Sequence, residues 1–191
     1  MKKKGFTLAE VLITLGIIGV VAALTLPTLS TNAQSQANAS KLASTVSDLE
    51  NAFGLILMTD SSDPLQLHDM DLSSESLYTK ISKNMKTNGD TTASKEYGAD
   101  NPFSGITLPK NTVFMTKSGA MVFIDDKQAE ADDDANGNVD KYFGNAYIDV
   151  NGKTKPNKLG KDVFSFHLGE DGILYPMDDA TKKLVKNGYK L

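Results

Sequence analysis

The sequence predicts an α+β fold in which one long amino-terminal helix packs on a small antiparallel β-sheet domain. Two observations lead to this prediction. The first is an almost unbroken apolar run from Phe6 to Leu26, followed by apolar residues at helical spacing as far as about Met58. The second is a series of short β-rich runs in the carboxyl-terminal half, bounded by turns rich in glycine, asparagine and aspartate.

The apolar run Phe6–Leu26 has the length of a membrane span. As a helix it measures about 32 Å, and the hydrocarbon core of a bilayer is about 30 Å thick. The lysines at positions 2–4 precede it and would hold this end on the cytoplasmic side. Glu10 is unusual here, because a carboxylate at membrane depth costs about 2.5–3.5 kcal/mol. We therefore treat Glu10 as a candidate functional residue.

A partner for Glu10 can be produced by proteolysis. Cleavage between Gly5 and Phe6 would leave a positively charged amino terminus at nearly the same depth as the carboxylate. A neighbouring chain, shifted along the helix axis, would bring the two charges together. Glu10 would then be buried as one member of an ion pair.

These residues carry a family resemblance. KKKGFTLAEVLITLGIIGVVAALTLP resembles the amino terminus of the type IV pilin and type II secretion pseudopilin superfamily. In that family a prepilin peptidase cleaves after the glycine and N-methylates the new first residue. The resemblance implies cleavage after Gly5, methylation of Phe6, an assembly role for Glu10 and a helix kink at Pro27. It also implies a pilin-like fold.

On this interpretation the chain has four parts. They are a leader peptide at 1–5, the transmembrane half of the long helix at 6–27, its second half at 28–58 and a globular pilin-like domain at 59–191. An ordinary secretory signal and an uncleaved anchor are the alternatives for the amino terminus. The length of the apolar run and the acidic residue inside it argue against both.

The net charge and the absence of cysteine limit the classes of function that remain possible. The formal net charge is −4, and removal of the leader lysines would make it more negative by three. This balance argues against specific nucleic-acid binding, which needs a basic face. The chain has no cysteine, so a domain outside the cytoplasm must be held by core packing, a metal or assembly. Many type IV pilins close their carboxyl-terminal region with a disulfide, and its absence favours the pseudopilins.

The long helix should continue beyond Pro27. Apolar residues recur there at steps of three and four, which places them in one stripe on a helix. This stripe should pack on the globular domain. It consists of Leu42, Val46, Leu49, Phe53 and Ile56.

The remaining elements follow from turn residues and β-rich runs. We expect a loop at 59–72, a short helix at 73–85 capped by Ser73 or Ser74, and a loop at 87–111. A hairpin should pair residues 112–116 with 120–125 through Lys117-Ser118-Gly119. Further strands are expected at 146–150, 163–168 and 173–175, followed by a helical tail at 182–186.

An acidic stretch in the second half indicates a calcium site. Its oxygen-bearing residues and one glycine match the first nine positions of an EF-hand loop, but Phe143 stands where a bidentate glutamate is needed. A further ligand would have to come from elsewhere, such as Asp149, Asn151 or Asp162. The alternative is a solvated acidic turn. The candidate ligands are Asp132, Asp134, Asn136 and Asp140.

The segment 148–166 reads as strand, ordered loop and strand. Side-chain to backbone hydrogen bonds from Asp149, Asn151, Asn157 and Asp162 should hold this loop together, in preference to a catalytic role. The chain has two histidines, without metal-ligand spacing, and it lacks a cysteine nucleophile and a G-x-S-x-G motif. We therefore do not expect an enzyme.

The sequence thus predicts a structural subunit of a type IV pilus or type II secretion pseudopilus. Its expected partners are prepilin peptidase, copies of itself and other pilins, and an inner-membrane assembly platform. It should cross the bacterial inner membrane once, with its carboxyl-terminal domain outside the cytoplasm, before it enters the filament. The alternative function is a minor pilin-like adaptor at a filament tip, binding DNA, a substrate or a surface.

Overall fold

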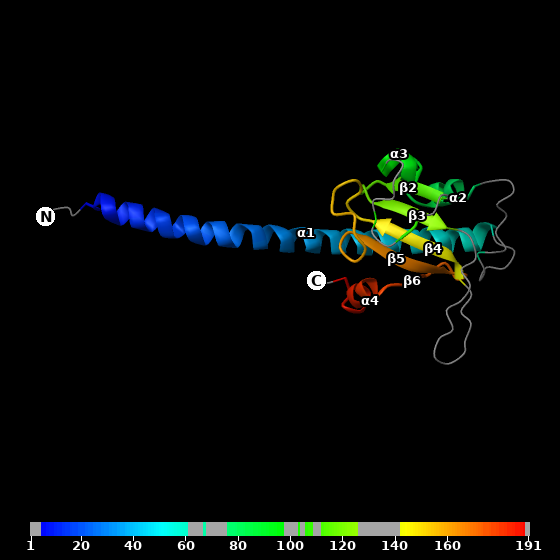
Figure 1. Cartoon of the computed structure of the whole chain (residues 1–191). Helices are drawn as coiled ribbons and strands as arrows, with labels where there is room; N and C mark the ends of the chain where they lie inside the picture. The colour runs from blue at the N-terminus through cyan, green and yellow to red at the C-terminus, as the bar shows by residue number, and fades with distance from the viewer. Residues whose placement is uncertain are drawn as a thin grey trace. The chain divides into compact units, whose positions relative to one another are not determined.

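The computed structural model describes residues 5–60, 67, 76–97, 103, 106–108, 112–125 and 142–189. The chain divides into two compact units, Met1–Ala37 and Asn38–Leu191, which we call unit 1 and unit 2. Helix α1 (Leu8–Asp60) runs through both units (Figure 1). The fold is the predicted α+β, pilin-like arrangement of an apolar amino-terminal helix and an antiparallel sheet.

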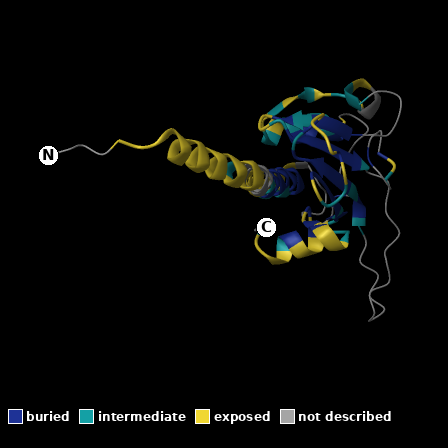
Figure 2. Cartoon of the chain, turned by 60° about the vertical axis from the view of Figure 1, so that its left-hand side comes forward, coloured by how far each residue is buried: buried dark blue, intermediate teal, exposed yellow. Residues whose placement is uncertain are grey.

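Unit 1 contains the apolar part of α1. Its segment Leu8–Thr25 is long and apolar enough to cross a membrane, with a mean hydropathy of 2.3. None of this segment is buried inside the chain, and Figure 2 shows it as an exposed helix. The backbone stays helical through Pro27, and the kink at this residue stays a prediction.

In unit 2, the carboxyl-terminal part of α1 buries its apolar stripe against one face of the sheet. The predicted stripe is confirmed, because each of its side chains is at most 4 % exposed. The stripe shares one core cluster with sheet residues such as Val122, Ile148 and Phe166. Burying an apolar side chain of this size stabilises the fold by about 1.5–3 kcal/mol, so this packing is a main source of stability.

In the described part of the chain, the sheet has six strands, each antiparallel to its neighbours, in the order of the sequence. Figure 1 labels β2 to β6 in this order. The longest pairing joins β4 and β5, from Tyr142 opposite Gly169 to Asp149 opposite Val163. The strands are β1 (Thr87–Asp90), β2 (Thr112–Thr116), β3 (Met121–Asp125), β4 (Tyr142–Asp149), β5 (Val163–Gly169) and β6 (Leu174–Pro176).

The second face of the sheet is covered as well. Helix α3 (Ala93–Tyr97) places its Tyr97 ring 5.1 Å from the ring of Phe103, which lies 6.0 Å from that of Phe123 on β3. These side chains belong to a second core cluster with Tyr147 and its neighbours. A sheet buried on both faces favours continuous apolar runs over alternation. This explains why nearly all of β3 is buried.

Two further helices are capped by side chains. Ser76 caps α2 (Leu77–Asn84) by accepting a hydrogen bond from the Thr79 amide. Asp178 caps α4 (Asp179–Lys186) by accepting from the amides of Ala180 and Thr181. Such caps satisfy helix-start amides that have no partner within the helix.

Several predicted boundaries were wrong. Helix α4 begins at Asp179 and not at residue 182, because Asp178 caps it there. Strand β4 begins at Tyr142 and not at residue 146, through a register shift that lets it pair with β5 as far as Gly169. The cap of α2 is Ser76, whereas Ser73 and Ser74 lie outside the described residues.

The loop predicted at 87–111 was also wrong in part, because it contains β1 and α3. The sequence of β1, TNGD, has little strand preference of its own. Its pairing with β2, through Thr87 opposite Thr116, supplies what the local sequence lacks. The other strands in the described part, β2, β3, β5 and β6, lie within a residue of their predicted positions.

Candidate functional site at the amino terminus

Helix α1 begins with reciprocal hydrogen bonds between Thr7 and Glu10. The amide and the hydroxyl of Thr7 donate to Glu10 Oε2 at 2.8 and 2.9 Å. In return, the Glu10 amide donates to Thr7 Oγ1 at 3.2 Å. This is a capping box, in which a threonine and a glutamate three residues later satisfy each other's amides. Glu10 therefore helps to start the helix, in addition to placing a charge in an apolar segment.

The hydroxyl groups of the segment find partners inside the helix. Thr14 Oγ1 donates to the Val11 carbonyl and Thr25 Oγ1 to the Val21 carbonyl, each at 2.9 Å. In a bilayer every such group needs a partner within the protein, because there is no water to supply one. Glu10 differs, because a carboxylate can accept several more hydrogen bonds than the two from Thr7. Its carboxylate therefore has room for a further donor, such as a cationic group.

The Gly5–Phe6 bond precedes the helix. Neither residue is helical, and the Phe6 side chain is 88 % exposed. A side chain built on Gly5 would meet nothing within 4 Å, so the surrounding fold does not require a glycine here.

Residues 1–26 match the family model of the prokaryotic N-terminal methylation motif. This chain carries a prepilin-type amino terminus. The motif is the hallmark of type IV pilin and pseudopilin precursors, and it implies processing by prepilin peptidase. No curated protein and no solved structure matches the chain significantly.

The chain has a second polar cluster in unit 2, in the loop that joins β4 to β5. Asp162 is 1 % exposed. Its carboxylate accepts hydrogen bonds from the amides of Asn157 and Lys158 at 2.8 and 2.6 Å. The side-chain amide of Asn151 donates to it as well, at 3.2 Å. For Asp162, these contacts confirm the prediction that side-chain to backbone hydrogen bonds hold this loop together.

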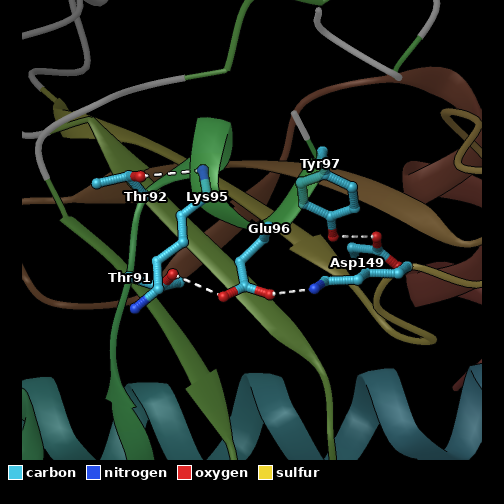
Figure 3. A network of polar contacts seen from close by, with 7 residues as sticks. Thr91, Thr92, Lys95, Glu96, Tyr97 and Asp149 are labelled. Atoms are coloured by element: carbon cyan, nitrogen blue, oxygen red, sulfur yellow. Dashed lines mark hydrogen bonds and ion pairs between the residues drawn. The ribbon is translucent and has the colours of Figure 1, made fainter. Parts of the chain in front are cut away.

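Asp149 connects the same loop to α3 (Figure 3). The Tyr97 hydroxyl donates to Asp149 Oδ2 at 2.6 Å, and the Asn151 amide donates to Oδ1 at 3.1 Å. Beside this contact, Glu96 pairs with Lys153 at 3.0 Å and accepts from the Thr91 hydroxyl at 2.7 Å. The sequence did not reveal the role of Tyr97, because its partner lies far along the chain.

Burial raises the pKa of the Asp149 carboxyl to about 7, and the Tyr97 hydrogen bond opposes this shift. A carboxyl whose pKa is raised on folding stabilises the folded state fully below its unfolded pKa, near 3.8. That contribution is lost as the pH rises through about 7. Through this group, the wild type should lose about 4 kcal/mol in its free energy of unfolding over this pH window. Asp149→Asn should not show this loss.

The measurement is denaturant unfolding of the full chain at several pH values between 4 and 8. The difference in the free energy of unfolding between wild type and Asp149→Asn at each pH gives the contribution of Asp149 alone. Tyr97→Phe is the matched variant, because it keeps the ring and removes the hydroxyl. It should move the loss of stability to higher pH. Parallel curves for wild type and Asp149→Asn would show that Asp149 stays charged throughout.

The predicted calcium ligands Asp132, Asp134, Asn136 and Asp140 lie outside the described residues. Within the described part, no group of three or more histidine, aspartate or glutamate side chains could hold a metal ion. Phe143, at the twelfth loop position, is a core residue that is 5 % exposed. Both oxygens of Asp162 accept amide hydrogen bonds, so Asp162 is a poor candidate for the missing ligand.

Calcium binding stays a prediction with a direct test. A ligand that binds only the folded state stabilises it by about 2.7 kcal/mol at a hundredfold excess over Kd. The protein should therefore melt at a higher temperature in millimolar calcium than in chelator. Asp134→Ala should remove most of this difference, whereas Asp63→Ala, outside the acidic stretch, should not. Equal melting temperatures and no calorimetric signal would identify the stretch as a solvated turn.

Proposed function

We propose that this protein is a structural subunit of a type IV pilus or type II secretion pseudopilus. The register of Gly5, Phe6 and Glu10 at the start of an exposed apolar helix is the observation that carries this proposal. The apolar helix is continuous with a stripe that forms the core of a folded unit. This arrangement suits a subunit that is held first in the inner membrane and later in a filament.

The proposed sequence of events begins with prepilin peptidase. Cleavage after Gly5 converts a neutral peptide nitrogen into an amine at Phe6, which the same enzyme N-methylates. This cation neutralises the Glu10 carboxylate of an adjacent subunit, because an unpaired charge is costly in an apolar surrounding. Repetition of one such contact produces an open helical array. The apolar helices would lie in its core, and an inner-membrane platform would add the subunits.

Mass spectrometry of the protein from cells that contain prepilin peptidase tests this proposal. The mature chain should begin at N-methylated Phe6. Gly5→Leu should leave only precursor in the membrane. Gly16→Leu is the matched control, since Gly16 also has open space around it and lies in the apolar segment that follows Gly5. This control should be processed normally.

Two results would contradict the proposal. Wild-type protein with an intact Met1 would show that no leader is removed. A cut after Ala33 would identify the apolar segment as an ordinary signal sequence. Electron microscopy of cells that overproduce the protein then separates a filament subunit from a tip adaptor, because only the former should form long filaments.

A further inference from the structure

Exposed lysines gather at one end of unit 2. The loop at 150–162 and helix α4 meet there, since a side-chain carbon on Gly160 would lie 2.7 Å from Ala180 Cβ. Figure 1 shows both elements at the end of the sheet where β5 begins. We call this the lysine surface, and its exposed members are Lys155, Lys158, Lys161, Lys182, Lys183 and Lys186.

The scaffold under these lysines is ordered. Asp162 holds the backbone of the loop at Asn157 and Lys158. Asp178 caps α4, and the buried Leu184 attaches this helix to the core. None of these lysines pairs with an acidic residue in the described part of the chain; the neighbouring Lys153 instead pairs with Glu96. The lysine surface therefore concentrates positive charge in a fixed place on an acidic protein.

Acidic side chains stand at the opposite end of the sheet. Glu170 and Asp171 follow β5, whose length is about 20 Å at roughly 3.3 Å per residue. Asp125 ends β3 and faces Asn145, which pairs with His167 near the end of β5. We call Asp125, Glu170 and Asp171 the acidic end. Unit 2 thus carries six exposed lysines at one end of the sheet, where Asp178 and Asp179 begin α4, and acidic side chains at the other end.

We propose that the lysine surface receives the acidic end of a second copy of this chain, so that globular units join head to tail. This inference rests on the proposed function, because a subunit of an open helical array offers two different surfaces to its neighbours. A two-fold symmetric contact through either end would bring like charges together, which is unfavourable. Head-to-tail contact instead lets a chain with net charge −4 attract its own copies.

A polyanion such as DNA is the competing occupant of the lysine surface. The net negative charge of the chain opposes its approach, whereas a second copy brings a matching acidic end. The two occupants differ in one respect that an experiment can use. Only a second copy would bring its acidic end against the lysine surface of the first chain.

Crosslinking of the full chain in an uncharged detergent tests this contact. The protein has no cysteine, so each introduced cysteine reports one position. We would prepare Lys158→Cys and Glu170→Cys separately and treat each alone, and then their mixture, with a short bismaleimide. Dimers should form in the mixture severalfold more than in either variant alone. The yield should fall in 1 M salt, where the Debye length is about 3 Å.

Charge reversal provides the second measurement. Lys158→Glu with Lys182→Glu should reduce filament yield about tenfold, as should Asp125→Lys with Glu170→Lys. All four changes in one chain should restore the filament yield, because the two ends then carry opposite charges again. Circular dichroism confirms that each variant is folded.

The outcomes separate this inference from the proposed function. If filaments form normally but the mixture gives no more dimers than the single variants, the head-to-tail contact is wrong and the subunit role stands. If no filaments form, the subunit role fails, while crosslinking in detergent still decides the contact. Retention of a DNA duplex by wild type but not by Lys158→Glu/Lys182→Glu, without dimers in the mixture, would assign the lysine surface to polyanions and overturn the proposal.

Discussion

Replacing Glu10 by valine should leave membrane insertion and processing intact and lower filament yield at least about tenfold. In the proposed filament, the Glu10 carboxylate neutralises the Phe6 amine of an adjacent subunit. Losing one partner leaves the other charge unpaired in an apolar surrounding, at a cost of about 2.5–3.5 kcal/mol. Each 1.4 kcal/mol changes an association constant about tenfold. The measurement is the amount of processed protein in sheared filaments relative to that in the membrane.

The capping box at the start of α1 makes a sharper variant available. Glutamine can replace glutamate in a capping box, because its side-chain oxygen also accepts the amide hydrogen bond of the cap residue. Glu10→Gln therefore keeps the contact with Thr7 and removes the charge. We expect it to assemble as poorly as Glu10→Val. Thr7→Ala removes the cap hydroxyl and keeps the charge, so it should cost about 1 kcal/mol of helix stability and assemble nearly normally.

The opposite pattern would change the interpretation of this residue. Normal filament yield from Glu10→Gln, with a severe loss in Thr7→Ala, would show that Glu10 acts as a helix cap and not as a charge. The sequence signal for the cap was the run Thr7-Leu8-Ala9-Glu10, a threonine three residues before a glutamate at the start of an apolar segment. The resemblance to pilins explained Glu10 by its charge and left Thr7 without a role.

Local patterns predicted the elements whose partners are close in the sequence or repeat regularly. The stripe on α1 follows a helical period that only one face can satisfy, and each member is buried. The hairpin of β2 and β3 has its turn residues between its strands, and its pairing follows from them. By contrast, β1 contains no such signal, and α3 offers only the Thr92 cap, whose hydroxyl accepts from the Lys95 amide. They exist through contacts with β2 and with the second core cluster, which the local sequence does not encode.

The same distinction applies to the candidate sites. Gly5, Phe6 and Glu10 stand in a fixed register within a few residues, so the sequence alone could indicate them, and their roles stay predictions. The loop at 150–162 was also readable, since Asp162 binds amides only four and five residues away. Tyr97 and Asp149 are separated by 52 positions, and their hydrogen bond depends on the complete sheet. The lysine surface depends in the same way on α4 meeting the loop.

Replacing Asp162 by alanine should lower the free energy of unfolding of unit 2 by about 3–5 kcal/mol. The buried carboxylate accepts from the amides of Asn157 and Lys158 and from the side chain of Asn151. Removing it leaves these donors without a partner, at about 1–3 kcal/mol for each that stays buried. For a protein of this size, 1 kcal/mol moves the melting temperature by about 2–4 °C. Thermal unfolding of the full chain, followed by circular dichroism, should therefore show a drop of about 6–20 °C.

Asp171→Ala is the matched control for this change. The Asp171 carboxylate also accepts hydrogen bonds, from the Ile173 amide and the Tyr175 hydroxyl, but the residue is exposed. Water can replace the lost acceptor there, so we expect a loss of less than about 1.5 kcal/mol. Equally small losses in both variants would show that the loop is held by its backbone contacts, such as the Gly160 amide with the Val163 carbonyl. In that case the lysine surface would keep its position without Asp162, and Asp162→Ala should crosslink through Lys158→Cys as efficiently as the parent chain.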